Sequence, residues 1–238
     1  MPHNRFYIDT PLNPNTTFSI EDDQCHYFRK VLRGAPGDTI EVINGKGALA
    51  HATVSSIGKN HFDACVTTCE NAPSPPFVLT LAIGFLKPSH LEYALEKACE
   101  LGSSRFLLFE ATLSEKKAVS PTYFQRLSSI VEAATKQCGR LYLPEIIVKN
   151  KMLECLDAKS AGFFGDFGPE AAPVHMLDLS NKKDVTVFIG PESGFTDEER
   201  RALISHQCRP ISLHPNTLRA ETAVVAATLL FQNALTSH

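Results

Sequence analysis

The sequence lacks the features that mark membrane and secreted proteins. No run approaches the roughly 18 apolar residues that a membrane-spanning helix requires, and none is present among the 238 residues. The first ten residues, MPHNRFYIDT, have no apolar core of the kind found in signal peptides. These absences predict a protein without membrane association that resides in the cytoplasm.

Regular spacings of cysteine and histidine are also absent. The seven cysteines are scattered without a CxxC pair, and the nine histidines show no HxxxH or HxH spacing. His61, Cys65 and Cys69 fall in HFDACVTTCE, which alternates like a strand and is followed by no second ligand pair. We therefore predict reduced, mostly packed thiols, no metal site, and no histidine that acts as a metal ligand or general base.

An excess of positive charge is missing as well. The chain has 23 basic and 26 acidic residues, for a formal net charge of −3. The total does not indicate a nucleic-acid-binding protein, but affinity for phosphate depends on where charges cluster. With 43% hydrophobic and 21% charged residues, the composition is typical of a globular protein with one large domain or two modest ones.

A turn-rich segment, NAPSPP at residues 71–76, separates two different patterns. Before it, RFYID, DTIEVING and KGALAHATVSSI alternate like strands, and Asn44-Gly45 is a strong hairpin signal. Between the first two strands, CHYFRKVLRGAPGD predicts a short helix with Phe28, Val31 and Leu32 on its buried side. The same helix would carry three basic residues outward, namely Arg29, Lys30 and Arg33.

After the linker, strand and helix patterns alternate. Strands are predicted in FVLTLAIGFL, SRFLLFEA, AGFFGDF, DVTVFIG and RPISL, and helices in HLEYALEKACELG, PTYFQRLSSIVEAATKQCG, TDEERRALISH and RAETAVVAATLLFQNAL. Such alternation predicts an α/β domain with a mostly parallel sheet. In these sheets a ligand binds at the carboxyl ends of the strands, where the strand order reverses.

Two loops lead from a predicted strand into a predicted helix, and neither has the GxGxxG or GxxxxGKS pattern of a phosphate-binding loop. In IGPESGF, residues 189–195, Gly190 and Gly194 would let the main chain approach a ligand closely. Thr196 and Glu199 then form a capping box for the next helix. Taken alone, this loop is equally compatible with an ordinary strand-to-helix connection.

The second loop, ISLHPNTLRAET at residues 211–222, leads into AVVAATLLF, which is apolar nearly all round. Such a helix needs burial in the core or against a partner, so we expect a homodimer that pairs through this C-terminal helix. Glu221 suits a helix N-terminus, whereas Arg219 lies at the unfavourable end of the dipole and is expected to face an anion or a carbonyl. A simple ion pair between Arg219 and Glu221 is the alternative.

IGPESGFTDEE and LHPNTLRAETA, together with RFYID, HYFRKVLRGAPGD, INGKG, LEKACELG and EAATKQCGRLYLPEI in the same order, resemble the bacterial 16S ribosomal RNA uridine N3-methyltransferases of the SPOUT superfamily. The resemblance implies a PUA-like RNA-binding β-barrel over residues 1–72. It also implies a SPOUT domain over residues 73–238, with a mostly parallel sheet and a deep trefoil knot. It further implies S-adenosylmethionine as cofactor and 16S rRNA of the small ribosomal subunit as partner.

The resemblance also implies roles for individual residues. We expect the catalytic set to be Arg219, Glu221 and Glu192. Arg219 would stabilise the charge that develops on O2 or O4 of the uridine or grip the target phosphate, with Glu221 or Glu192 orienting it. The cofactor set is Ile189, Gly190, Gly194, Leu213, His214, Leu218 and Gly165. The RNA-binding set is Arg5, Arg29, Arg33, Lys116 and Arg140.

Four positions depart from the family pattern, because Ser193 and His214 stand where the family usually has glycine, and Asn216 and Thr217 stand where it commonly has Arg-Ile. The two glycine replacements leave open a non-catalytic, RNA-binding ribosome-assembly factor with the same fold. A nucleotide-binding α/β enzyme with an unrelated small substrate is a further alternative, although it leaves the N-terminal β module unexplained.

Overall fold

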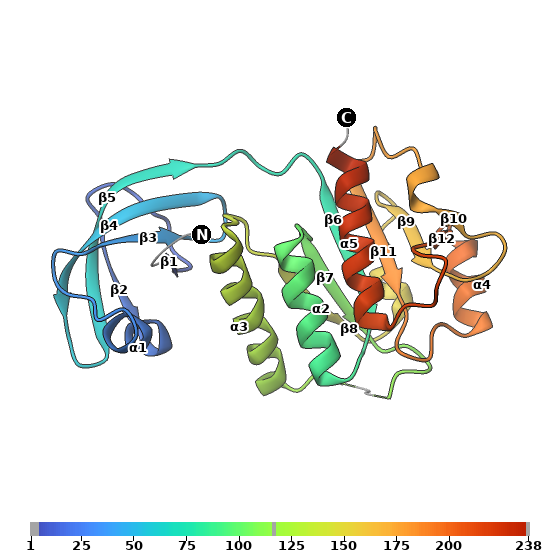
Figure 1. Ribbon diagram of the computed structural model, residues 1–238, viewed down its shortest axis with the longest axis horizontal. Helices are drawn as coiled ribbons and strands as arrows, with labels where there is room; N and C mark the ends of the chain where they lie inside the picture. The colour runs from blue at the N-terminus through green and yellow to red at the C-terminus, as the bar shows by residue number, and fades with distance from the viewer. Residues whose placement is uncertain (1–4, 116–117, 237–238) are drawn as a thin grey trace. The chain divides into compact units, whose positions relative to one another are not determined.

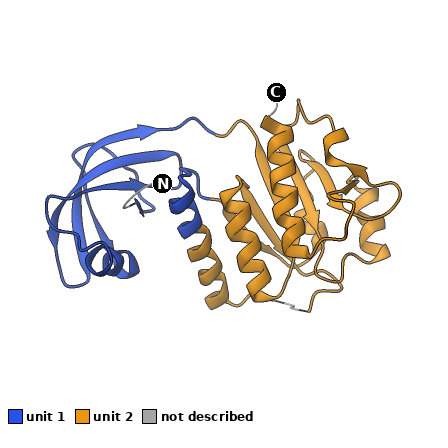
Figure 2. Ribbon diagram, in the orientation of Figure 1, with its two compact units in different colours: residues 1–74, 132–143 blue, residues 75–131, 144–238 orange. Residues whose placement is uncertain are grey.

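The computed structural model describes residues 5–115 and 118–236 (Figure 1). The chain divides into two compact units (Figure 2). Unit 1 consists of residues 1–74 and 132–143, and unit 2 of residues 75–131 and 144–238. The division therefore runs through the helix at residues 121–138, whose last turns belong to unit 1.

Unit 1 is built on a five-stranded sheet with the order β1-β3-β4-β5-β2. Its elements are β1 (Arg5–Tyr7), β2 (Thr17–Glu21), α1 (Asp22–Lys30), β3 (Thr39–Ile43), β4 (Ala48–Ile57) and β5 (His61–Asn71). β3 and β4 form the antiparallel hairpin predicted around Asn44-Gly45, whereas β1 pairs with β3 in parallel. The sheet has β1 and β2 as its two edges, so it forms a half-barrel.

Three aromatic side chains, Phe6, Phe28 and Phe62, form the centre of the unit 1 core, with ring centroids 4.4–5.9 Å apart. The expected apolar side of α1 is only partly correct. The helix ends at Lys30, and Val31 is 62% exposed. Leu32, and not Val31, packs against the core, and Arg33 then takes a left-handed conformation with φ of 54° that ends the helical direction of the chain.

Residues 132–143 join unit 1 through hydrogen bonds to its strands and loops. The Tyr142 hydroxyl donates to the Ala72 carbonyl at 3.0 Å, and the Gly47 N–H donates to the Leu141 carbonyl at 3.0 Å. This segment follows the predicted linker in sequence. Its membership in unit 1 is therefore a tertiary property that chain order does not reveal.

Unit 2 contains a seven-stranded sheet with the order β10-β12-β9-β11-β6-β7-β8. All of its strand pairs are parallel, which confirms the predicted sheet. The strands are β6 (Val78–Gly84), β7 (Arg105–Phe109), β8 (Glu145–Lys149), β9 (Ala161–Gly165), β10 (Ala172–Pro173), β11 (Asp184–Ile189) and β12 (Arg209–Ser212). β8 and β10 were not predicted from the sequence.

The unit 2 sheet is covered on both faces. The helical elements are α2 (Pro88–Glu100), α3 (Pro121–Cys138), α4 (Asp197–Ser205), α5 (Ala220–Thr236) and the 3-10 turns η1 (Met152–Cys155) and η2 (Val174–Met176). α2 and α5 pack side by side, and α5 also contacts β6 and β11 (Figure 1). On the opposite face, Leu203 of α4 packs with Met152 of η1 against Phe164 and Phe188.

α5 is not buried all round within the single chain. Val224, Ala227 and Phe231 are fully buried, whereas Leu229 is 45% exposed. The core thus covers one side of this apolar helix and leaves Leu229 on the surface. Homodimer pairing through α5 and the trefoil knot both stay predictions. No helix among the described residues is long and apolar enough to cross a membrane.

Candidate functional site

A cavity of about 310 Å³ lies where β9, β11 and β12 end at the same edge of the sheet. This is the position expected for a ligand in a parallel sheet, because the carboxyl ends of adjacent strands meet there. The lining includes all seven residues of the predicted cofactor set, namely Gly165, Ile189, Gly190, Gly194, Leu213, His214 and Leu218. The structure thus brings together residues that are up to 53 positions apart in sequence.

The first loop is held tightly at both ends. A Cβ atom on Gly190 would lie 3.0 Å from the carbonyl carbon of Gly194. The backbone at the start of the loop therefore packs directly against the backbone at its end. Gly194 has φ of 74°, a conformation that side chains disfavour. Thr196 and Glu199 form the predicted capping box at the start of α4. The Glu199 carboxylate also accepts hydrogen bonds from Thr112, at 2.8 and 3.1 Å.

The second loop is shaped by its own side chains. The His214 ring accepts a hydrogen bond at Nδ1 from the Asn216 N–H, at 3.0 Å. The Ser212 hydroxyl donates to the His214 carbonyl at 3.4 Å. At this departure from the family pattern, the imidazole therefore stabilises the turn between β12 and α5.

Sequence reasoning missed an ion pair in the cavity wall. Asp166 directly follows β9, and its carboxylate accepts from the Arg200 guanidinium of α4 at 2.7 Å. The Asp166 side chain is only 10% exposed. Phe167, the next residue, also lines the cavity and is 74% exposed. The position of GDF directly after a predicted strand could have suggested Asp166, but no local signal indicates Arg200.

The predicted catalytic residues lie beside this cavity. Glu192 lines the cavity itself, whereas Arg219 and Glu221 line an adjoining groove together with Ser89, His90, Tyr93 and Thr222. Arg219 is exposed, and among the described residues it forms no ion pair with Glu221. The simple ion-pair alternative is therefore not observed.

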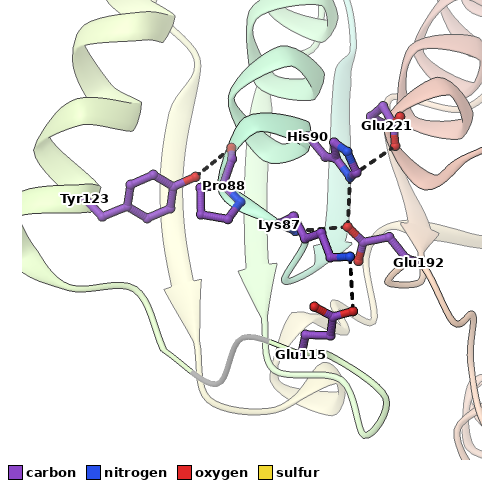
Figure 3. Close-up of polar contacts among 7 residues, drawn as sticks. All are labelled: Lys87, Pro88, His90, Glu115, Tyr123, Glu192 and Glu221. Atoms are coloured by element: carbon purple, nitrogen blue, oxygen red, sulfur yellow. Dashed lines mark hydrogen bonds and ion pairs between the residues drawn. The ribbon is translucent and has the colours of Figure 1, made fainter.

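The two glutamates Glu192 and Glu221 both face His90 (Figure 3). The Glu192 Oε1 atom accepts from the Lys87 N–H and lies 3.0 Å from His90 Nδ1. Partial burial opposes ionisation of Glu192, but the Lys87 N–H, its own backbone N–H and His90 outweigh this effect and lower the pKa of the carboxyl. The Glu221 Oε2 atom lies 3.7 Å from the same His90 nitrogen. No motif in the sequence marks His90, so it was not among the predicted site residues.

The predicted RNA-binding residues have different surroundings. Arg29 and Arg33 are exposed, and Arg29 lines a groove on unit 1 with Lys30, Lys59 and four other residues. Arg5 does not suit a phosphate contact, because its side chain is 8% exposed and pairs with Glu41 at 2.7 Å. Arg140 lies half-buried in the segment that joins unit 1. Lys116 lies outside the described residues.

The part of the chain that the structure describes contains no candidate metal site. There, no group of three or more His, Cys, Asp or Glu side chains is arranged to hold an ion. None of the seven cysteines forms a disulfide, and four of them are buried.

Comparison with known proteins gives consistent matches over nearly the whole chain. Residues 73–232 match the model of an RNA methyltransferase domain, and residues 20–64 match an RNA methyltransferase PUA domain. A protein of Rickettsia conorii named ribosomal RNA small subunit methyltransferase E is 30% identical over 95% of this chain and 94% of its own length. A Bacillus subtilis protein of the same name is 26% identical over 89% of this chain and 88% of its own.

Solved structures share the fold. A ribosomal RNA small subunit methyltransferase E from Neisseria gonorrhoeae, bound to S-adenosyl methionine, superposes with a TM-score of 0.88 at 22% identity and covers 99% of this chain and 98% of its own. A protein from Legionella pneumophila in complex with SAM gives a TM-score of 0.90 at 22% identity, with 98% of each chain covered. Since the methyltransferase model spans residues 73–232 and the PUA model spans 20–64, this chain belongs to the RNA methyltransferase family.

Proposed function

We propose that this protein transfers a methyl group from S-adenosylmethionine to N3 of a uridine in 16S rRNA of the small ribosomal subunit. The observation that carries the proposal is the cavity at the ends of β9, β11 and β12, which is lined by all seven residues of the predicted cofactor set. The names of the Rickettsia conorii and Bacillus subtilis relatives support a small-subunit rRNA substrate.

The residues of the cavity fit this cofactor. Its volume of about 310 Å³ lies within the range of small-molecule sites. Ile189, Leu213 and Leu218 offer an apolar surface suited to adenine, while glycines at 165 and 190 leave backbone accessible. The carboxylates of Glu192 and Asp166 offer acceptors for amino or hydroxyl groups and negative charge toward a sulfonium.

The reaction places clear demands on the protein. When bound, S-adenosylmethionine supplies an electrophilic methyl group, and the protein must hold the uridine in line with it. Uridine N3 carries a proton and becomes a good nucleophile only when that proton leaves, which puts negative charge on O2 and O4. Arg219 is exposed and lines the groove beside the cavity. We assign it to stabilise that charge.

Replacement of Arg219 tests this role. Arg219→Ala should reduce methyl transfer about 100-fold, in the range measured for loss of one charge-stabilising group. Affinity for S-adenosylmethionine, measured by calorimetry, should stay unchanged because Arg219 lies outside the cavity lining. Near-full methylation by this variant would refute the assignment.

For RNA, we propose that residues 1–72 bind the substrate and residues 73–238 carry the chemistry. Phosphate contacts by exposed basic side chains position a substrate without reading its sequence. Reversal of Arg29 and Arg33 to glutamate should weaken rRNA binding and leave cofactor affinity unchanged. Reversal of Lys182 and Lys183, which are exposed on unit 2, changes the net charge equally and is the matched control.

We also propose that the protein is cytoplasmic and forms a homodimer through α5, where Leu229 is 45% exposed on an otherwise apolar helix. Leu229→Glu should shift the dimer toward monomer in analytical ultracentrifugation. A wild-type protein that sediments as a monomer at micromolar concentration would contradict the proposal.

The overall function is tested by methyl transfer to small ribosomal subunits from cells that lack this protein. The assay uses S-adenosylmethionine labelled in the methyl group, and mass spectrometry of the rRNA then identifies the modified base. The expected result is one uridine methylated at N3. RNA binding without any transfer would instead support a non-catalytic assembly factor, in which Ser193 and His214, both in the cavity lining, had impaired the site.

A further inference from the structure

The groove beside the cofactor cavity combines groups that suit a pyrimidine base. His90 and Tyr93 come from α2, and Arg219 and Glu221 from the start of α5. Tyr93 is 49% exposed, so its ring is available for stacking. Arg219 offers positive charge for the base oxygens, and an imidazole lies in the same groove. The start of α5 lines both the groove and the cavity, since Ala220 and Ala223 contribute to the latter.

The contacts of His90 fix which ring nitrogen carries the proton. Nδ1 lies 3.0 Å from Glu192 Oε1, and the lowered pKa of Glu192 keeps that carboxyl ionised near neutral pH. An ionised carboxylate can only accept a hydrogen bond, so Nδ1 must be the donor. In the neutral ring, Nε2 is then left with an unprotonated lone pair, the arrangement in which a carboxylate orients a histidine base.

Glu221 adds a second carboxylate to the same imidazole. Its Oε2 atom is buried and has no hydrogen-bond partner among the described residues. The nearest ionisable nitrogen among the described residues is His90 Nδ1, at 3.7 Å, beyond hydrogen-bond distance. An unpaired buried carboxylate oxygen is costly. Positive charge on the imidazole would compensate it, so the two glutamates stabilise His90 in the state that follows proton uptake.

We propose that His90 is the base that removes the N3 proton of the target uridine, with Glu192 orienting the ring and Glu221 stabilising the imidazolium. The N3–H bond breaks and its proton moves to Nε2 of His90. The electron pair left on N3 forms the bond to the methyl carbon, while the bond from that carbon to sulfur breaks and its pair stays on sulfur. The assignment rests on the proposed function.

The charged and titratable groups around His90 come from four segments. They are Lys87 at the N-cap of α2 and Tyr93 on α2, Glu115, which pairs with Lys87 at 3.3 Å, Glu192 after β11, and Arg219 and Glu221 at the start of α5. Several of these groups also influence a pH profile. The decisive readout is therefore the acidity of the substrate and not the pH optimum of the enzyme.

The test compares His90→Gln and His90→Arg with the wild type, and uses His175→Gln as the control because His175 is an exposed histidine of the same unit. Loss of a general base lowers rates by about 10²–10⁴-fold, so His90→Gln should lose about 100-fold or more in kcat. Arginine keeps the positive charge between the two glutamates but cannot accept a proton, so His90→Arg should be equally slow. His175→Gln should match the wild type.

A structural role is separated from a chemical one by binding and by substrate acidity. Both His90 variants should bind S-adenosylmethionine within twofold of the wild-type Kd, measured by calorimetry. Their rate defect should shrink at alkaline pH, and also with rRNA that contains 5-fluorouridine, whose N3–H is more acidic and ionises with less help. Since His90→Arg also keeps a cation at this position, it carries the test if His90→Gln proves unstable.

Two results would overturn the proposal. One is activity restored by His90→Arg, which would show that only the charge matters. The other is a defect that stays constant across pH and substrate acidity. A wild-type enzyme that transfers no methyl group would instead refute the proposed function, so the two failures are distinguishable.

Discussion

Gly190→Ala is a direct test of how the first loop builds the cavity. A Cβ atom at this position would lie 3.0 Å from the carbonyl carbon of Gly194, 3.2 Å from its Cα and 3.2 Å from the Phe195 nitrogen. Carbon atoms in favourable contact lie about 3.5–4.0 Å apart. All three neighbours are backbone atoms, so no side chain can rotate away, and the loop itself must move by several tenths of an ångström.

The expected magnitude follows from overpacking in a tight structure, which costs about 1–3 kcal/mol. We therefore expect Gly190→Ala to lower the free energy of unfolding by that amount. Binding must also restore the displaced loop, and every 1.4 kcal/mol weakens affinity tenfold. Affinity for S-adenosylmethionine should thus fall on the order of tenfold. Urea denaturation measures the first quantity and titration calorimetry the second.

Two other glycines of the cavity are matched controls. Gly194→Ala finds nothing within 4 Å of its new Cβ but has φ of 74°, so it should cost roughly 1–2 kcal/mol through backbone strain alone. A Cβ on Gly165 would contact the Ile189 Cδ1 atom at 3.4 Å. Gly165→Ala should therefore keep wild-type stability within about 1 kcal/mol while its methyl group reduces the space for the cofactor.

The contradicting result is that Gly190→Ala has a free energy of unfolding within about 0.5 kcal/mol of the wild type and binds the cofactor equally well. Such a result would mean that the backbone contact between Gly190 and Gly194 does not define the cavity. If Gly190→Ala loses stability but none of these variants changes cofactor affinity, the cavity is not the cofactor site.

Three further predictions concern stability and reactivity. Thr196→Ala removes the N-cap of α4 and should cost about 1 kcal/mol in urea denaturation; no change would show that Glu199 alone holds the helix start. Gly34→Ala places a Cβ 2.0 Å from the Phe28 ring and should destabilise unit 1 by about 1–3 kcal/mol, so a wild-type melting curve would contradict the packing described. Burial raises the pKa of the Cys155 thiol to about 12. Iodoacetamide should therefore alkylate the partly exposed Cys65 well before Cys155, as measured by peptide mass spectrometry. Equal rates of alkylation would show that Cys155 is accessible.

Most elements of unit 2 could be predicted because their signals are local. β6 and β11 are short apolar runs between turn signals, and α4 begins at a capping box. β8 was missed although EIIVK contains three β-branched apolar residues, because an apolar run this short does not by itself distinguish a strand. β2 in unit 1 was also missed, because it is equally short and only Ile20 is buried.

The residues of the candidate site also divide into those that local sequence signals predicted and those that they missed. Gly190 and Gly194 were predicted because glycines in a strand-to-helix loop are visible in a single stretch of sequence, and Leu213 was predicted from the family resemblance; all three line the cavity. Arg200 and His90 were missed because neither is part of a motif. Their significance depends on partners that are distant in sequence, as in the contact between His90 and Glu192 across 102 positions. Arg5 was predicted to bind RNA, but its side chain pairs with Glu41. This pairing depends on β1 and β3 lying side by side, which the sequence does not reveal.

The sequence by itself determined the alternation of strands and helices, the two loops and the family, because periodicity, turn chemistry and capping depend on neighbouring residues. The tertiary structure alone decided that residues 132–143 join unit 1, that β11 lies between β9 and β6, and that two glutamates share one imidazole. The physical reason is that strand order and the meeting of distant side chains are set by long-range packing, which no local pattern encodes.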